Sequence, residues 1–296
     1  MSIGRILLLF AVVSAGLACR ANCKDTLPAV DAAYGTLRVV QRNIGHFAMG
    51  TARNSTVTAE ESAARACEYR AKIDELGADI LGVSEYSDLF DIAGTPSTNA
   101  VFAAFPTRII GPQNAYQCNA VFSKLPCVRS EVVNYHARHQ QTYFLDAVFL
   151  VGTNEVHFVQ THLDWSSCDM AADARPRQIR QIIEHFRDVP RVIISGDWNV
   201  YGAGEYYPLI MAGYTLANCG YAGCLNTVPK FDKRMPCRRF PLDNVAVRGF
   251  RVGDVFLDDV KCLLSDHRII GCTLSFFGVS PREVPTRCRG ATTCPY

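Results

Sequence analysis

The chain has 296 residues, of which 20% are charged and 49% are hydrophobic, and its formal net charge is +2. This length allows one large α/β domain or two smaller domains, each with a substantial core. The charge argues against a protein that is basic over its whole surface, although a local basic patch can still bind an anionic partner. No internal repeat or low-complexity linker divides the sequence, so we expect one domain over residues 22–296.

The amino terminus predicts a cleaved secretory signal over residues 1–21. Arg5 precedes an apolar run over residues 6–18, and small residues follow that run. The run is too short for a confident transmembrane helix, and no other segment is long enough to span a bilayer. Cleavage fits after Ala18 or after Ala21, and a lipid anchor on Cys19 is a weaker alternative because Gly16 stands three positions before it. We therefore expect a secreted protein.

The cysteine content supports an oxidising compartment. A chain with 13 cysteines is unusual for a reduced cytosol, and cleavage after Ala21 removes Cys19 and leaves an even number. The alternative, a zinc site, favours closely spaced Cys-x-x-Cys pairs, which the sequence lacks. We expect disulfides, with Cys219/Cys224 and Cys288/Cys294 as natural short-range pairs.

Apolar runs alternate with polar helical stretches along the chain. A strand is expected over 36–43, followed by a helix over 58–77 with Thr58 and Glu61 in capping-box spacing and Gly77 at its end, and by a strand over 78–85. A second helix is expected over 174–188, beginning near Pro176. Further strands are expected over 119–123, 142–151, 155–162, 191–197, 244–247 and 267–276. Many strands with few helices predict two packed mixed sheets with helices outside.

Several expected strands end in a residue that can bind a metal ion or transfer a proton. These residues are Asn43, Glu85, His162, Asp197 with Asn199, and, just before the last strand, Asp266 with His267. Strand ends of a layered α/β protein meet at one edge of the sheets. A single Asn or Asp after a strand is usually a turn former, and a single His is usually structural. The repeated pattern instead predicts a site.

Seven short motifs carry a resemblance to a known family. They are "RNIG" around Asn43, "LGVSEY" around Glu85, "CNAVFSKLP", "THLD", "SGDWN", "LDNVAV" and "LSDH". Their order resembles that of the endonuclease/exonuclease/phosphatase superfamily, in its DNase I-like form, and the resemblance spans residues 37–277. It implies a four-layer α/β sandwich of two packed mixed β-sheets flanked by helices, a divalent ion (Mg²⁺ or Mn²⁺) and hydrolysis of phosphate esters.

The resemblance also implies roles for single residues. The metal ligands are Glu85, with Asn43 beside it, and Asp266 on the same side. The general base is His267, whose ring Asp243 orients in the manner of a hydrolase triad. Asp197 and Asn199 position the nucleophile and the phosphate, and His162 donates a hydrogen bond or a proton. Gly45 and Ser84 differ from residues common in DNA-repair members, which argues against a second metal position.

Three groups of residues are candidates for substrate contact. Arg175 in "ARPRQ" has equal claims to a structural and a substrate role. The basic loop 229–240 contains Lys233 and Arg238, and it is either a solvated loop or a rim that contacts phosphate groups. The segment 134–144 adds His136, Arg138 and His139 with weaker support.

The first hypothesis is a secreted Mg²⁺-dependent phosphodiesterase of the nuclease type, monomeric, with nucleic acid as the favoured substrate. The second is a sphingomyelinase, phospholipase C or inositol-phosphate type of phosphoesterase. Its action on lipid head groups needs an apolar hairpin for membrane docking, and residues 88–106 are the candidate. The third is a non-catalytic binding or toxin-like protein, which the complete set of site residues argues against.

Overall fold

A computed structural model describes residues 35–45, 59–87, 97–113, 118–137, 140–165, 169–220, 223–234, 238–258 and 265–276. The expected signal over residues 1–21, the capping residue Thr58 and the expected pair Cys288/Cys294 lie outside the described residues. Within those ranges, no helix has the length and apolar character that a membrane span requires.

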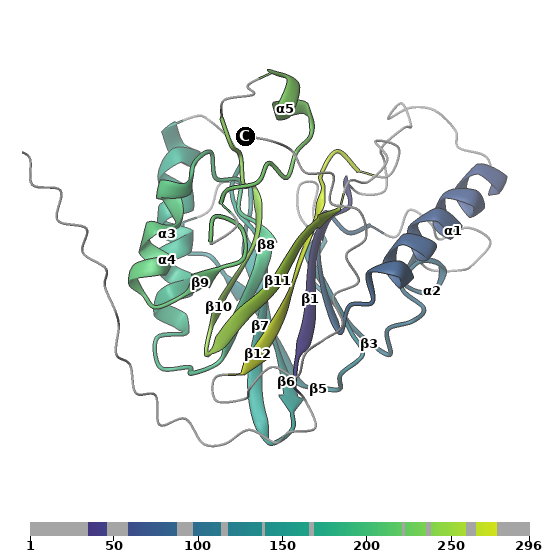
Figure 1. Cartoon of the computed structure of the whole chain (residues 1–296), viewed down its shortest axis with the longest axis horizontal. Coiled ribbons are helices and arrows are strands. Elements are labelled where there is room, and N and C mark those ends of the chain that lie inside the picture. Colours follow the sequence, from purple (N-terminus) through teal and green to yellow (C-terminus); the bar gives the residue numbers. More distant parts are fainter. Residues whose placement is uncertain are drawn as a thin grey trace, which may run out of the picture.

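The chain folds into two six-stranded mixed sheets (Figure 1). The first sheet has the order β11-β12-β1-β2-β4-β3, and the second has the order β5-β6-β7-β8-β10-β9. The first contains β1 (Leu37–Asn43), β2 (Ile80–Ser84), β3 (Thr107–Ile110), β4 (Ala120–Ser123), β11 (Phe250–Asp258) and β12 (Ile269–Phe276). The second contains β5 (Cys127–Asn134), β6 (Tyr143–Val151), β7 (Asn154–His162), β8 (Val192–Asp197), β9 (Thr215–Leu216) and β10 (Asp243–Arg248).

Helices cover both outer faces of this pair of sheets. Helices α1 (Ala59–Leu76) and α2 (Ser97–Ala100) lie on one side, and α3 (Asp169–His185) and α4 (Tyr207–Met211) lie on the other (Figure 1). The 3₁₀ helix η2 (Ala203–Tyr206) precedes α4, and α5 (Lys230–Arg234) precedes β10 in the chain. The predicted α/β sandwich with two packed mixed sheets is therefore confirmed.

The alternation of side chains along each central strand builds three apolar layers. In β1, Val39 packs between the two sheets, whereas the next residue, Val40, packs against α1. Helix α1 contributes Tyr69, Ile73 and Leu76, which recur every three to four residues and so share one face. Helix α3 covers the second sheet in the same way through Ile179 and Ile182. Full burial of one such aliphatic side chain stabilises the fold by about 1.5–3 kcal/mol.

Each sheet contains one parallel pair of strands, and the two pairs determine where the site forms. In the first sheet, β1 runs parallel to β2 with Asn43 opposite Ser84. In the second, β7 runs parallel to β8 with His162 opposite Asp197. Strand β10 runs antiparallel to β8 and places Asp243 opposite the same Asp197. The predicted convergence of strand ends is thus a consequence of this register.

The second expected helix differs from the prediction at its start. Helix α3 begins at Asp169, and Pro176 lies inside it instead of near its first turn. Proline removes one backbone N–H donor, but a helix can continue past it when packing against a sheet compensates the loss. In α3 the buried residues Ile179 and Ile182 provide that packing.

The cysteine prediction is confirmed at one pair. Cys219 and Cys224 form a disulfide with their Cα atoms 3.9 Å apart. Among the residues that the structure describes, Cys67, Cys127 and Cys272 are free thiols, so disulfides do not use every remaining cysteine. Cys272 is fully buried between the sheets, and burial raises the pKa of its thiol to about 12. Such a thiol packs as a small apolar side chain.

Candidate active site

The site begins where β1 and β2 end. Asn43 is the last residue of β1, and Glu85 directly follows β2 with a backbone φ of 55°. This left-handed conformation is uncommon for a residue other than glycine, asparagine or aspartate, and such strain concentrates at functional sites. Glu85 is half-buried, whereas Asn43 is fully buried. The turn therefore brings a carboxylate to the edge of the first sheet.

Asn43 bridges one carboxylate from each sheet, those of Glu85 and Asp197. Its side-chain oxygen accepts the backbone N–H of Gly45 at 2.9 Å. An N–H donor requires the oxygen there, so the NH₂ group faces the other way and donates to Glu85 Oε1 and to Asp197 Oδ2, both at 2.9 Å. This arrangement gives Asn43 a bracing contact beside Glu85. The ligand role that the resemblance implies needs the Asn43 oxygen, which faces Gly45 in this structure.

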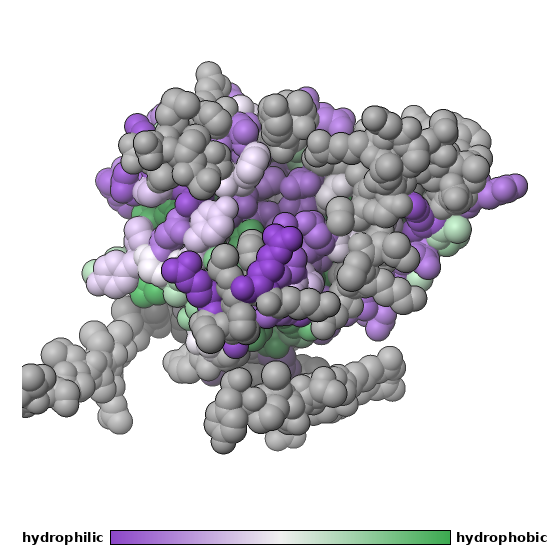
Figure 2. Space-filling model, turned by 90° about the horizontal axis from the view of Figure 1, so that it is seen from above, coloured by the Kyte–Doolittle hydropathy of each residue, from purple (hydrophilic) through white to green (hydrophobic). Residues whose placement is uncertain are grey.

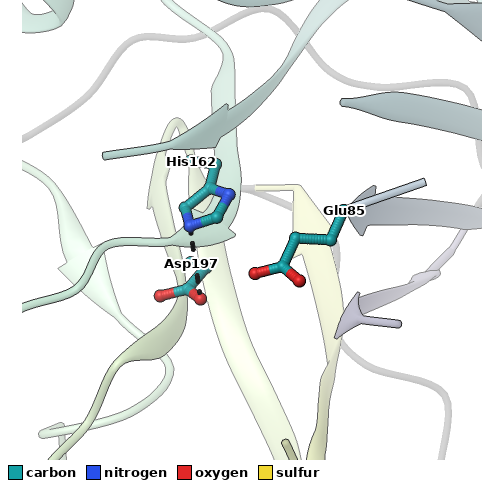
Figure 3. Close-up of side chains that lie close together, drawn as sticks. All are labelled: Glu85, His162 and Asp197. Atoms are coloured by element: carbon teal, nitrogen blue, oxygen red, sulfur yellow. Dashed lines mark ion pairs between the residues drawn. The ribbon is translucent and has the colours of Figure 1, made fainter. Parts of the chain in front are cut away.

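Glu85, His162 and Asp197 form a compact group across the two sheets. Figure 3 shows the Glu85 carboxylate pointing toward Asp197 and the His162 ring lying over Asp197. His162 Nε2 lies 3.7 Å from Asp197 Oδ2, and one ligand atom from each of the three residues lies within 4.8 Å of the others. Both His162 and Asp197 are almost completely buried. Two carboxylates at this separation suit a hard divalent cation such as Mg²⁺.

A second group of titratable side chains adjoins the first. His267 Nδ1 and Asp243 Oδ2 are 2.7 Å apart, and Asp197 Oδ2 lies 3.8 Å from the same ring nitrogen. The backbone N–H of His267 donates to Ser265 Oγ at 3.0 Å, and that hydroxyl donates to the carbonyl of Asn43 at 2.7 Å. These contacts fix the position of the imidazole relative to the first sheet.

The electrostatics of this pair favour a charged imidazole. Burial by itself would lower the pKa of His267, but the charges of Asp243 and Asp197 outweigh it and raise that pKa to about 10. Asp243 is fully buried, and its backbone N–H donates to Thr227 Oγ1 at 3.0 Å. The protein without a bound ion therefore holds His267 as an imidazolium between two carboxylates at neutral pH.

Asn199 sits two residues beyond the end of β8 and shapes the loop there. Its φ is 50°, which asparagine tolerates, and its backbone N–H donates to Asp197 Oδ1 at 3.1 Å. Its side-chain NH₂ donates to the carbonyl of Leu163 at 2.9 Å, so the amide is anchored to the end of β7. Asn199, which was predicted to act together with Asp197, therefore lies beside it.

Asp266 lies apart from the compact group of Glu85, His162 and Asp197. Its carboxylate is 3.4 Å from Lys230 Nζ in α5 and 4.0 Å from His267 Nε2, and it is more exposed than the carboxylates of Asp197 and Asp243. Within the described ranges, the clusters able to hold a metal ion do not contain it. Asp266 therefore faces the rim of the site, between His267 and the basic loop.

The substrate candidates separate into two kinds. Arg175 is buried, and it donates to Glu205 Oε2 and to the carbonyl of Asp164, both at 3.1 Å. These contacts favour a structural role for Arg175 over contact with substrate. Arg238 is exposed, as a rim residue must be. The backbone of Lys233 lies in α5, but its side chain is outside the described residues.

Of the three candidates in the segment 134–144, the structure describes His136. His136 is exposed beside α3, where it lines a shallow surface depression with Arg177, Arg180 and Gln181. Its backbone N–H donates to Gln181 Oε1 at 2.8 Å. Arg138 and His139 lie outside the described residues. His136 therefore lies beside α3, and its contact with substrate stays a prediction.

A buried polar network that the sequence pattern did not reveal supports the site from below. Gln41 donates to Asp243 Oδ1 at 3.4 Å, and its own oxygen accepts from Gln160 at 3.0 Å and from Ser195 at 2.9 Å. These side chains lie between the sheets, where apolar residues are the rule. The available signal was a polar residue in each of the predicted strands that became β1, β7 and β8.

Figure 2 views the molecule from above, on the face that carries α5, and the described side chains on this face are mostly hydrophilic. Lys230, Arg234, Arg238 and Arg239 are exposed in and after α5. The contact between Lys230 and Asp266 places this segment beside His267. The mouth of the site is therefore bordered by positive charge, while its floor is acidic.

Comparisons with known proteins support the fold. No protein-family model and no curated protein matches the chain. Solved structures do match. An endonuclease/exonuclease/phosphatase from Beutenbergia cavernae has a TM-score of 0.66 and 17% identity, over 83% of this chain and 72% of that chain. One from Bacteroides vulgatus has a TM-score of 0.61 and 16% identity, over 81% and 99%. TDP2 of D. rerio, solved with a single strand DNA product, has a TM-score of 0.61 and 18% identity, over 81% and 99%.

The chain therefore has the fold of the endonuclease/exonuclease/phosphatase proteins, as the order of its motifs predicted. At these identities the likeness concerns the fold.

Proposed function

We propose that this chain is a secreted, divalent-metal-dependent phosphodiesterase that cleaves nucleic acid. The observation that carries the proposal is the position of the His267–Asp243 pair, 2.7 Å apart, beside the carboxylate group of Glu85 and Asp197. A buried imidazole held by a carboxylate can transfer protons, and two convergent carboxylates can hold a cation. A phosphate diester needs both functions to be hydrolysed.

The residues present fit a hard divalent ion. Glu85 and Asp197 offer carboxylate oxygens from the two sheets, and the NH₂ group of Asn43 already relieves the repulsion between them. Mg²⁺ or Mn²⁺ held there would neutralise charge on the phosphate and orient it for attack. Glu85 and Asp197 are the ligands that this structure supports best, with Asn43 at their side.

The protons are handled by the chain itself. Neutral His267 takes a proton from the attacking water, and Asp243 then stabilises the imidazolium through Nδ1. The water oxygen bonds to phosphorus while the bond to the leaving oxygen breaks. His162, buried over Asp197, donates a hydrogen bond to the phosphate. Positive charge near Asp197 weakens its hold on the His267 proton and favours the neutral base.

Two observations favour nucleic acid as the substrate. The exposed residues Lys230, Arg234, Arg238 and Arg239 border the mouth of the site, where they can contact successive backbone phosphates. In addition, TDP2 of D. rerio, which shares this fold, was solved with a single strand DNA product. A basic rim above an acidic, cation-binding floor suits a polyanion whose scissile phosphate reaches the ion.

The lipid-hydrolysing alternative loses its structural support in the described residues. Its candidate docking hairpin covers 88–106, but Val101, Phe102 and Phe105 are buried in the core under α1. Phe102 stacks on Phe122 with ring centroids 3.8 Å apart. These apolar side chains stabilise the first sheet and are not available to a membrane. Residues 88–96 lie outside the described part of the chain.

The substrate class can be tested on the oxidised mature protein. Supercoiled DNA, RNA, sphingomyelin vesicles and an inositol phosphate are each incubated with Mg²⁺ or with EDTA. We expect nicking of DNA or cleavage of RNA with Mg²⁺ and none with EDTA. Turnover of only the vesicles or the inositol phosphate would replace nucleic acid by the second class, and inactivity on all four would support a binding protein.

Secretion is tested separately. The full-length chain is expressed in a secreting host, and the mass and amino terminus of the product are measured. We expect export to the medium and cleavage after Ala18 or after Ala21. An uncleaved product retained in the cytoplasm would contradict this part of the proposal. Size-exclusion chromatography with light scattering tests the expected monomer.

A further inference from the structure

A second cluster of metal-binding side chains lies away from the candidate active site. It consists of Glu131 in β5, Asp146 in β6, His157 in β7 and His185 in the last turn of α3. Asp146 is two residues from Phe144, which packs under α3, so both side chains lie on the α3 face of the second sheet. His157 precedes His162 by five residues in β7, which separates the two positions by about 16 Å along the strand.

The cluster has the spacing of a coordination site. His185 Nε2 is 3.5 Å from Glu131 Oε1, and one ligand atom each from Glu131, Asp146 and His185 lies within 4.8 Å of the others. Zinc binds imidazole nitrogen and carboxylate oxygen at about 2.0–2.2 Å in a tetrahedral arrangement, which places neighbouring ligand atoms about 3.4 Å apart. The His185–Glu131 distance already matches. The Asp146 distances are at most 4.8 Å, so they need to close by no more than about 1.4 Å.

The burial of Asp146 is an independent observation that points to a bound cation. Its residue surface is only 3% exposed, yet its Oδ1 atom has no hydrogen-bond partner within the described residues. Glu131 stands directly opposite Asp146 in the β5–β6 ladder, and like charges at such positions repel each other. A buried carboxylate oxygen without a donor destabilises the folded state, so a ligand that supplies positive charge at this atom stabilises the fold.

The surroundings hold the ligands in place. His157 Nδ1 lies 2.8 Å from Asp146 Oδ2, so the other carboxylate oxygen of Asp146 is already fixed and Oδ1 is directed elsewhere. The His185 ring packs edge-on against Phe144 and Phe186, with centroids 5.5 Å and 4.6 Å apart. These contacts reduce the entropy that the side chains would lose on binding an ion.

We propose that Glu131, Asp146 and His185 bind one Zn²⁺ ion, with His157 orienting Asp146. The imidazole ligand favours Zn²⁺ over Mg²⁺, which takes oxygen ligands and retains water. Because Glu131 is exposed, a water molecule can occupy the fourth coordination position of the ion. Because Glu131 lies in the edge strand β5 and His185 ends α3, the ion links the edge of the second sheet to the helix that covers it.

The test uses the full mature chain in a Glu85→Gln background, with Mg²⁺ present, to suppress binding of Zn²⁺ at the candidate active site. After removal of metals with EDTA and dialysis, Zn²⁺ is titrated by calorimetry, and Co²⁺ is titrated by visible absorption. We expect one equivalent of Zn²⁺ to bind, and we expect His185→Gln and Glu131→Gln each to weaken its binding at least tenfold. Both side chains are partly exposed, so these variants should fold, which circular dichroism verifies.

Glu155→Gln and His136→Gln are the matched controls, because they make the same substitutions at exposed residues outside the cluster. We expect both to bind Zn²⁺ as the background protein does. Saturating Zn²⁺ should also raise the melting temperature of the background protein and leave that of the His185→Gln variant unchanged. The proposal is overturned if the background protein binds no equivalent, or if the equivalent persists in the Glu131→Gln/His185→Gln double variant.

Discussion

At the residue scale, the contact between His267 and Asp243 changes the pKa of the His267 imidazole. In the protein without a bound ion, the two neighbouring carboxylates raise the pKa of His267 to about 10, against an ordinary value of 6.5. The stabilisation that this charged imidazole contributes is fully present below pH 6.5. It is lost as the pH rises from 6.5 through about 10, because the folded state then releases the proton.

The first prediction follows from that shift. In metal-free protein, NMR titration should show that His267 titrates close to pH 10. Asp243→Asn removes the larger of the two attractive charges and should lower this pKa substantially. Thermal unfolding should become less dependent on pH between 7 and 10 in that variant. A His267 that titrates near 6.5 in the parent protein would contradict the geometry.

Asn43 supports a second prediction. Its NH₂ group lies between Glu85 and Asp197, and Asn43→Asp replaces two donors with a third negative charge. Hydrogen bonds to charged groups contribute about 1.5–3 kcal/mol each, so we expect a loss on the order of 2–4 kcal/mol in the free energy of unfolding in EDTA. Mg²⁺ should restore part of it, because the extra carboxylate attracts the ion. Equal destabilisation of the variant with and without Mg²⁺ would argue against a cation site here.

At the scale of elements, the predicted strands are the central ones and the unpredicted strands are the edges. β3 and β11 border the first sheet, and β5 and β9 border the second. Strand β5 is exposed at most of its positions, and β11 is exposed or half-buried at all positions after Phe250, so neither carries a continuous apolar run. The central strand β8 is buried at every position and β7 is buried from Phe158 onward, so their apolar residues allowed both strands to be predicted. Pairing, not composition, defines an edge strand.

The site was predictable for a related reason. Asn43, Glu85, His162 and Asp197 end strands whose apolar runs mark them clearly, and parallel pairing places such ends together. Contacts that depend on a loop were not predictable. The pairing of Asp266 with Lys230 and of Arg175 with Glu205 joins segments whose relative position no periodicity encodes. The Gln41 network likewise depends on how the two sheets face each other.

That network gives a third prediction. Gly82 in β2 faces it so closely that an added Cβ atom would lie 2.0 Å from Gln160 Oε1 and 2.5 Å from Ser195 Oγ. We expect Gly82→Ala to lower the free energy of unfolding by about 1–3 kcal/mol, the usual cost of overpacking, and to reduce activity by displacing Gln41 from Asp243. Gly202→Ala is the matched control because no atom lies within 4 Å of its added Cβ. Equal stability of the two variants in urea unfolding would contradict the packing described.

At the scale of the whole molecule, the two sheets meet so that both parallel pairs end at one site, while the helices remain outside (Figure 1). Because the packed sheets and the polar strand ends serve separate purposes, the fold can persist at 14–18% identity to solved structures. The sheets require only apolar residues of suitable size, and the chemistry requires only a few polar side chains at strand ends. The rim around α5 is less constrained and is where substrate preference can change.

The fourth prediction concerns that rim. Arg234→Ala/Arg238→Ala should weaken the affinity for DNA and reduce the slope of log affinity against log salt by about 1–2, because up to two phosphate contacts are lost. Arg70→Ala/Arg187→Ala makes the same change of charge on α1 and after α3 and should leave the slope unchanged. If both double variants lowered the affinity equally, net charge and not the rim would account for binding.

The central claim is that His267 and the Glu85 site act together on a phosphodiester. The most direct measurement is the rate of Mg²⁺-dependent nicking of supercoiled DNA by the parent protein, His267→Ala and Glu85→Gln, all verified as folded. We expect nicking by the parent protein that EDTA abolishes, and a loss of at least about a thousandfold in each variant, since each removes a group that acts in the transition state. Full activity of the His267→Ala variant, or nicking that persists in EDTA, would contradict the account.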